Sequence, residues 1–335
     1  MEYALLQAVF LPLLLSPLAY IIGRKVGHTA ATWFTFGLLL YCTILVITAS
    51  IDGTYEEHYP WTELFGEFGL LLDGLAAPFA IMIYVLCTIL ALYSKPYMLH
   101  KFQDFFKEQA PKPVYQSDGT TLQSISLEKF VNRQSGVYYA LFLVFSMGML
   151  GTVLATNLIE FYIFFEVMLI PAFLLVGFWG DYPRLRIALM FFFWTHVGAV
   201  ILLLGLLAIG LSVGSFDFAD INEADIPPDI LFPAAVAIII GLGVKLAAFG
   251  FHIWLPYAHG SAPTPISALL SPAMIGIGAY ALFRLIVEFL PQTYADLSIW
   301  LTIWGVATMF YGGAMALMQD DIKRVFAYSS ISQMG

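Results

Sequence analysis

The chain has 335 residues, of which 60% are hydrophobic and 11% are charged, and its formal net charge at pH 7 is −9. Because a soluble domain carries about 25% charged residues, this composition excludes soluble α/β and solenoid folds. It indicates an all-α, polytopic protein that lies in the lipid bilayer and has no nucleic-acid partner. The two cysteines, Cys42 and Cys87, fall inside apolar runs, so we expect small core residues rather than a redox or metal site.

Apolar runs of about 20 residues mark the expected membrane spans. A tenth run begins near residue 324 and reaches only residue 335, which is too short to cross a bilayer. We therefore expect about ten spans, the last one truncated, in a fragment of a longer protein or a protein with an unusual end. A nine-span protein with a re-entrant tail is the less favoured alternative. The nine complete runs lie near 4–22, 29–50, 70–94, 136–156, 158–179, 185–212, 230–255, 265–290 and 295–318.

The distribution of lysine and arginine predicts the orientation of these spans, because cytoplasmic loops carry an excess of both. The first run is preceded by Glu2 and followed by Arg24 and Lys25, which is the reverse of a signal peptide. With the N-terminus outside, twelve of the fourteen cations fall on the inner side, and the outer loops are acidic. The two remaining cations, Lys245 and Arg284, lie within spans.

One sizeable polar segment interrupts the apolar runs. Residues 1–94 would hold the first three spans, and residues 95–135 would form a cytoplasmic connector loop. Two prolines and an Asp-Gly pair inside that loop are turn signals. A short amphipathic piece is expected at 122–131, and the loop is too short for a catalytic domain.

A single lysine, Lys245, lies in the apolar part of residues 236–272. A charge at the centre of a membrane helix costs roughly 3 kcal/mol on insertion scales, so such residues are functional candidates by default. Glycines at 241, 243 and 250 and Pro256 predict a broken helix, which membranes tolerate where it lines a cavity. The alternative is a lysine that extends to the interface, which would be a long reach from this position.

A glutamate, Glu166, lies inside the run at 158–179 with apolar residues on both sides. If it neighbours Lys245, the proton occupancy of the two groups would depend on their separation. This favours a proton relay, and the alternative is a static ion pair that fixes helix packing. Glu160, six residues earlier, is expected near the outer interface, and Arg284 with Glu288 is expected to form an i,i+4 pair.

Three histidines, His196, His252 and His259, lie in or near spans and are possible proton-relay groups. For each, the alternative is a hydrogen-bonded core histidine. His252 follows Lys245 by seven residues, so a continuous helix would place both on one face. No cluster has metal-ligand spacing. The G-x-G-x-x-A string at 276–281 lies in an apolar run with no preceding strand, so we expect no cofactor site in this chain.

Four stretches resemble the antiporter-like, proton-pumping subunits of respiratory complex I, most closely the chain M type of NADH-quinone oxidoreductase. They are LLLDGLAAPF at 70–79, FFEVMLIPAFLLVGFWG at 164–180, FHIWLPYAHGSAPTPISALLS at 251–271 after Lys245, and DDIKRVFAYSSISQMG at 320–335. Multi-chain Mrp-type cation/proton antiporters and membrane-bound hydrogenases share this module.

The resemblance implies a proton-translocating subunit of a complex I-like enzyme in the plasma membrane of a prokaryote. Glu166 and Lys245 would be the fifth-helix glutamate and seventh-helix lysine of its proton channel. Residues 136–290 would form the first five-helix repeat, and residues 291–335 would begin the second. Quinone, flavin and iron–sulfur clusters are expected in partner subunits, which include neighbouring antiporter-like subunits.

The sequence departs from this family at two informative positions. Gly276 stands where many members carry an eighth-helix lysine, and Tyr257 replaces a common acidic residue. A lateral proton link from Lys245 would then need water, His196, or hydroxyl groups such as Ser271 and Tyr280. Two alternatives remain besides the oxidoreductase subunit. One is a subunit of an Na⁺/H⁺ antiporter, and the other is a scaffold whose buried charges only hold helices together.

Overall fold

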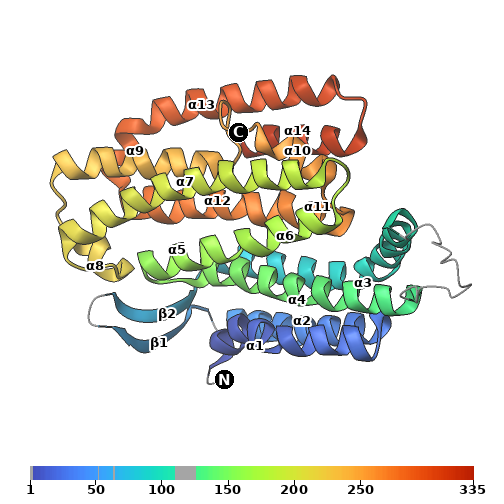
Figure 1. Ribbon diagram of the computed structural model, residues 1–335. Helices are drawn as coiled ribbons and strands as arrows, with labels where there is room; N and C mark the ends of the chain where they lie inside the picture. The colour runs from blue at the N-terminus through green and yellow to red at the C-terminus, as the bar shows by residue number, and fades with distance from the viewer. Residues whose placement is uncertain (1–2, 52, 63–64, 110–125) are drawn as a thin grey trace, which may run out of the picture.

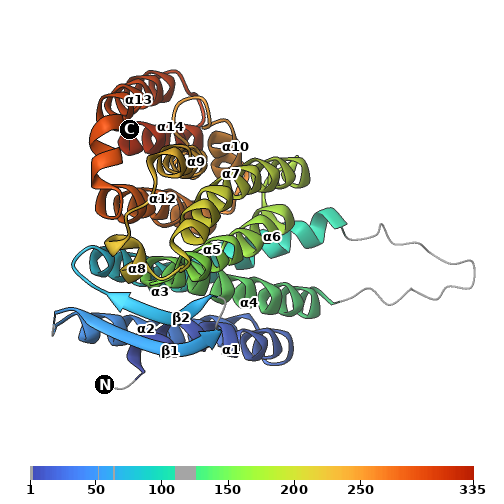
Figure 2. The same ribbon diagram turned by 90° about the vertical axis from the view of Figure 1, so that its left-hand side faces the viewer.

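The computed structural model describes residues 3–51, 53–62, 65–109 and 126–335. Within them, nine helical segments are long and apolar enough to cross a membrane, which confirms the expected polytopic all-α protein. The helices lie side by side, with α1 and α2 at one edge of the bundle and α13 and α14 at the other (Figure 1, Figure 2). The nine segments are Ala4–Lys25, His28–Ile51, Ala76–Glu108, Leu127–Leu154, Leu158–Trp179, Arg184–Val213, Pro228–Lys245, Thr264–Glu288 and Pro291–Leu317.

An antiparallel hairpin was not predicted and lies between the second and third helices. Strand β1 (Tyr55–Thr62) pairs with β2 (Gly66–Leu72), so the apolar residues from Leu70 extend a strand rather than begin a helix. Helix α3 (Ala76–Gln109) begins only after Asp73, whose Oδ1 accepts hydrogen bonds from the backbone N–H groups of Leu75 and Ala76. The expected span at 70–94 was therefore wrong at its start, because this cap fixes the first turn of the helix.

The expected connector loop at 95–135 was wrong at both ends. Helix α3 continues to Gln109, and α4 (Leu127–Leu154) begins behind Ser126, which caps it. The buried Phe102 packs against His28, Tyr138 and Trp179, which explains why α3 extends beyond its most apolar part. Residues 127–131 of the expected amphipathic piece belong to α4, and the remainder lies outside the described residues.

The middle of the bundle contains α5 (Leu158–Val167), α6 (Leu169–Trp179), α7 (Arg184–Val213) and α9 (Pro228–Lys245), with the short α8 (Phe218–Glu223) before α9. Helices α7 and α9 approach closely at Gly198, where an added Cβ would lie 2.6 Å from the Cβ of Val244. The close approach fixes the position of Lys245 next to α7.

The two cysteines, Cys42 and Cys87, are both free and buried, in agreement with small core residues.

The seventh span is broken, as predicted. Helix α9 ends at Lys245, and α10 (Trp254–Ser261) begins nine residues later. Backbone φ angles of +54° at Ala247 and +93° at Gly250 turn the chain between them. Three indole N–H groups satisfy carbonyls left open by the break: Trp254 donates to Val244, Trp194 to Phe251 and Trp304 to Phe249.

The eighth span contains two π-helical turns. It consists of α11 (Thr264–Leu269), η1 (Leu270–Met274), α12 (Ile275–Leu282) and η2 (Phe283–Glu288). Pro272 has no N–H to donate within η1, and the Ile275 N–H instead bonds the carbonyl of Leu270. Helices α13 (Pro291–Leu317) and α14 (Ile322–Met334) follow and pack against each other.

Candidate functional site

Lys245 is the last residue of α9 and is only 2% exposed. Its Nζ lies 4.4 Å from the ring centroid of Phe165, which is the residue before Glu166 on α5. No ion pair within 4 Å joins Lys245 to Glu166, although the glutamate is the charge that acts on the lysine. The structure therefore brings the two predicted residues into electrostatic reach, with an aromatic ring as the direct contact of the ammonium group.

The direct partner of Glu166 is His196 on α7. The His196 Nδ1 and the Glu166 Oε2 are 2.8 Å apart, and the imidazole stacks on Phe192 at an interplanar angle of 7°. This contact was not predicted, because the two residues are thirty positions apart on different helices. Of the three histidines, only His196 touches the predicted glutamate.

Of the other two histidines, His252 lies within the helix break and His259 lies on α10. His252 would share a helical face with Lys245 only in a continuous helix, and this condition is not met because α9 ends at Lys245. The His252 ring lies 4.6 Å from that of Tyr311. His259 is 2% exposed, and its Nδ1 is 2.9 Å from the Oγ of Ser267.

Several buried polar atoms near the broken helix have no hydrogen-bond partner among the described residues. They are the Glu166 Oε1, the His252 Nδ1 and the His259 Nε2. Buried polar groups nearly always bond to protein or to ordered water. Internal water is therefore expected at these three positions, which lie on α5, within the break and on α10.

Gly276 on α12 is buried, yet an added Cβ would meet no atom within 4 Å. Ser271 precedes it by five residues and lies in η1, and its hydroxyl lies 2.6 Å from that of Ser330 on α14. The Tyr280 hydroxyl, by contrast, donates to the carbonyl of Val153. Of the two hydroxyl groups predicted for a lateral link, Ser271 faces the second half of the molecule, whereas Tyr280 ties α12 to α4.

Glu160 lies in the first turn of α5, at the expected end of its span, and it is buried within the protein. It is 1% exposed, and its Oε2 accepts a hydrogen bond of 3.2 Å from the Gly69 N–H of β2. The hairpin, which could not be recognised from the sequence, covers this end of α5. Glu160 is therefore a buried contact between α5 and the hairpin.

Arg284 forms the predicted pair with Glu288 at 2.8 Å, and it also bonds a carboxylate that was not predicted. Its Nη2 lies 2.8 Å from both Oδ1 and Oδ2 of Asp73, the residue that caps α3. Burial disfavours the charged form of Asp73, but hydrogen bonds from the Ala76 N–H and Arg284 outweigh it, so the pKa of that carboxyl is lowered. The guanidinium is 3% exposed and thus joins the third and eighth spans through a nearly buried ion pair.

This network predicts different stability losses for its two carboxylates. Asp73→Asn should lower the free energy of unfolding by about 2 kcal/mol, because it removes one partner of a buried charge and weakens a helix cap. Glu288→Gln should cost less, since Glu288 is 43% exposed. Thermal unfolding in detergent, followed by circular dichroism, measures both. Equal losses would contradict this ranking.

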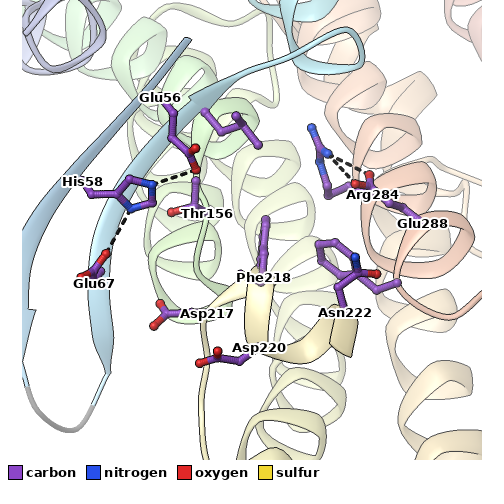
Figure 3. A pocket seen from close by; sticks show the side chains of 13 residues that line it. Glu56, His58, Glu67, Thr156, Asp217, Phe218, Asp220, Asn222, Arg284 and Glu288 are labelled. Carbon is purple, nitrogen blue, oxygen red and sulfur yellow. Dashed lines mark hydrogen bonds and ion pairs between the residues drawn. The ribbon is translucent and has the colours of Figure 1, made fainter. Parts of the chain in front are cut away.

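Arg284 and Glu288 also line a pocket of about 490 Å³ at the hairpin end of the bundle (Figure 3). Acidic side chains from three separate segments gather there, and His58 lies between two of them. Four of the acids predicted for the outer loops thus come together at one end of the molecule, beside Glu288 of the eighth span. The four are Glu56, Glu67, Asp217 and Asp220. In the part of the chain that the structure describes, no group of three potential ligands has metal-binding geometry.

Two curated relatives match nearly the whole chain. The NAD(P)H-quinone oxidoreductase chain 4 2 of Microcystis aeruginosa is 29% identical over 98% of this chain and 55% of its own length. The NADH-quinone oxidoreductase subunit M of Rickettsia typhi is 31% identical over 90% of this chain and 55% of its own length. The chain thus spans about half the length of the curated relatives that it matches.

Three solved structures share the fold at low sequence identity. A chain of the membrane-bound sulfane sulfur reductase, an archaeal respiratory membrane complex, aligns with a TM-score of 0.80 at 22% identity, covering 98% of this chain and 63% of that chain. A chain of respiratory complex I from Thermus thermophilus aligns with a TM-score of 0.76 at 24% identity, covering 98% of this chain and 62% of that chain. A chain of the Mrp complex from Dietzia sp. aligns with a TM-score of 0.76 at 19% identity, covering 100% of this chain and 58% of that chain.

A family model identifies the second half of the chain. It is described as NADH:quinone oxidoreductase/Mrp antiporter, TM, and it matches residues 155–335. That range contains α5, the broken seventh span and the π-helical eighth span, and it makes up more than half of the chain. The chain therefore belongs to the NADH:quinone oxidoreductase/Mrp antiporter transmembrane family.

Proposed function

We propose that the chain is a proton-translocating membrane subunit of a complex I-like NADH (or related donor):quinone oxidoreductase, in which Glu166 and Lys245 couple quinone reduction to proton pumping. The observation that carries this proposal is the environment of Lys245. A buried ammonium group at a helix break, without a carboxylate in contact, is costly to keep. Such a group is suited to exchanging its proton rather than to holding helices together.

The side chains around Lys245 support a switch in its proton occupancy. A negative charge on Glu166 favours the protonated lysine, because opposite charges stabilise each other across the low-dielectric interior. His196 competes for that charge through its contact with the Glu166 Oε2. When His196 or a bound proton neutralises Glu166, Lys245 loses its electrostatic support and gives up its proton.

We propose that the proton then moves laterally through the open space at Gly276. Helix α12 passes directly beside the break, since an added Cβ at Gly278 would lie 3.1 Å from the Cγ of Leu246. From Gly276, the Ser271–Ser330 pair leads to α14 and the second half of the protein. Water in this space and the two hydroxyl groups would stand in place of the lysine that many family members carry.

Filling this space should slow proton transfer without preventing folding. Gly276→Val places a side chain where an added Cβ meets nothing within 4 Å, and we expect donor-driven proton uptake to fall several-fold. Gly276→Ala should retain most of the activity. Gly278→Ala is the matched control, because its Cβ would crowd Leu246 and should lower stability rather than transfer. Full activity in Gly276→Val would exclude the proposed route.

The remaining parts of the enzyme are proposed to lie in other subunits. Quinone, flavin and iron–sulfur clusters bound there would supply the redox free energy, and neighbouring antiporter-like subunits would flank this chain. We further propose that the protein lies in the plasma membrane of a prokaryote with its N-terminus outside. Lysines and arginines that gather at the opposite end of the bundle, such as Lys101, Arg186 and Lys323, support this orientation.

An alternative function is an Mrp-type Na⁺/H⁺ antiporter or a membrane-bound hydrogenase, and the fold does not separate these from complex I. The test is acidification of vesicles carrying the full-length subunit in its native assembly. Proton uptake driven by NADH and quinone would support the oxidoreductase. Proton movement that follows an Na⁺ gradient and ignores the electron donor would instead establish the antiporter.

A further inference from the structure

A second pocket, of about 550 Å³, lies at the opposite end of the bundle from the acidic one. We call it the inner pocket. Its walls are the loop between α6 and α7, the first turns of α7, the helix α10 and the start of α14. None of the proposed proton-relay residues lines it, so the proposed function does not account for it.

Two arginines on different helices line the inner pocket with unpaired charges. Arg186 lies on α7 and Arg324 on α14, and both are exposed. In the described part of the chain neither guanidinium contacts a carboxylate, and that of Arg324 lies 5.7 Å from the ring centroid of Tyr257. A planar guanidinium group can donate two parallel hydrogen bonds to the oxygens of one phosphate. Two arginines that line the same pocket therefore form a candidate anion site.

The carboxylates of the inner pocket are already engaged. Asp181 contacts Lys101 and lies 3.3 Å from the Nζ of Lys323. Burial disfavours the charged form of Asp181, but these two lysines outweigh that effect and lower its pKa. The Asp321 Oδ1 accepts the backbone N–H of Arg324 as the cap of α14. Among the described residues, the two arginines of the pocket therefore form no ion pair with its own carboxylates.

Part of the inner pocket has an apolar lining. The lining side chains are Ile187, Met190 and Pro256, together with Ile253 and Tyr257, which are 47% and 46% exposed. Along α7, other large apolar side chains are also exposed, namely Leu189, Phe193 and Val197. Two arginines beside apolar side chains at the end of a membrane span match a phospholipid, whose phosphate would bind the arginines and whose acyl chains would contact the apolar side chains. A free anion would contact only the arginines.

We infer that the inner pocket binds an anionic phospholipid, with its phosphate between Arg186 and Arg324 and its acyl chains along α7. The site joins the first repeat to the beginning of the second, because α7 and α10 belong to one and α14 to the other. Bound lipid would hold α14 in place, and with it Ser330. The inference stands whether or not the proton-pumping function is correct.

Lipid-dependent thermal stability of the purified native assembly tests this inference. Delipidated wild-type protein should gain several degrees in Tm with phosphatidylglycerol and much less with phosphatidylcholine or inorganic phosphate. Arg186→Gln with Arg324→Gln should weaken binding of phosphatidylglycerol by roughly ten- to a hundredfold. Lys25→Gln with Lys129→Gln removes the same charge elsewhere and should bind as wild type.

The Tm of each variant without lipid separates a loss of lipid binding from misfolding. Arg186→Lys keeps the charge but not the paired hydrogen bonds, and it should bind with intermediate affinity. All variants should show wild-type Tm without lipid. Equal stabilisation by phosphatidylcholine, an equal effect of inorganic phosphate, or unchanged binding in the double arginine variant would each overturn the lipid site. So would crosslinking that places a partner polypeptide against Arg324.

Discussion

Lys245→Ala is expected to reduce donor-driven proton uptake to roughly a tenth of the wild-type rate or less, since a positioned proton-transfer group contributes 10²–10⁴-fold. The physical reason is that, in the proposed relay, Lys245 exchanges its proton while it is buried against Phe165 and within electrostatic reach of Glu166. Uptake is measured in vesicles and normalised to assembled complex. Quinone reduction should fall with it if redox chemistry and transport are tightly coupled.

Lys245→Arg separates a relay from a scaffold. Arginine keeps the positive charge but holds its proton at every accessible pH, so it should pack and assemble while remaining as inactive as the alanine variant. Lys245→Met fills the same space without charge and controls for the cavity. If arginine restores pumping, or if assembly fails while pumping per assembled complex stays normal, the lysine only stabilises the helices.

Glu166→Gln is expected to lower both proton uptake and coupled turnover by about tenfold or more. Glutamine can still hydrogen-bond His196 but can neither bind a proton nor carry the charge that acts on Lys245. Glu166→Asp keeps the carboxylate on a shorter side chain and should retain part of the activity. Vesicle assays of uptake and quinone reduction measure all three proteins.

Glu160→Gln is the matched control for this prediction. Both glutamates lie on α5 and have an unpartnered buried oxygen, but Glu160 bonds the hairpin rather than the histidine. Its substitution should alter stability and leave pumping per assembled complex intact. Wild-type rates in the Glu166→Gln protein would remove Glu166 from the relay.

The features that follow from local pattern could be predicted from the sequence. Runs of apolar residues revealed nine spans, since the bilayer sets their length. Glycines and a proline around Lys245 indicated the broken helix, because both residue types weaken a continuous helix. The isolated charges Glu166 and Lys245 stood out because the membrane makes such residues rare.

The features that depend on distant residues could not be predicted. The hairpin remained hidden because its second strand, Gly66–Leu72, runs into an apolar stretch that also suits a helix. The Asp73–Arg284 pair joins residues 211 positions apart, and a single sequence carries no signal for it. His196 was a candidate as one histidine among three, and only the packing of α7 against α5 distinguished it.

The two π-helical turns of the eighth span also bear on how far its length can vary. A π-turn holds one residue more than an α-turn, because its hydrogen bonds join residues five rather than four positions apart. Deleting Pro272 would restore an α-turn and rotate the following segment by about 100°. Tyr280 would then lose Val153, and Arg284 would turn away from Asp73. We therefore expect the length of this segment to be held more strictly than the identity of most residues within it.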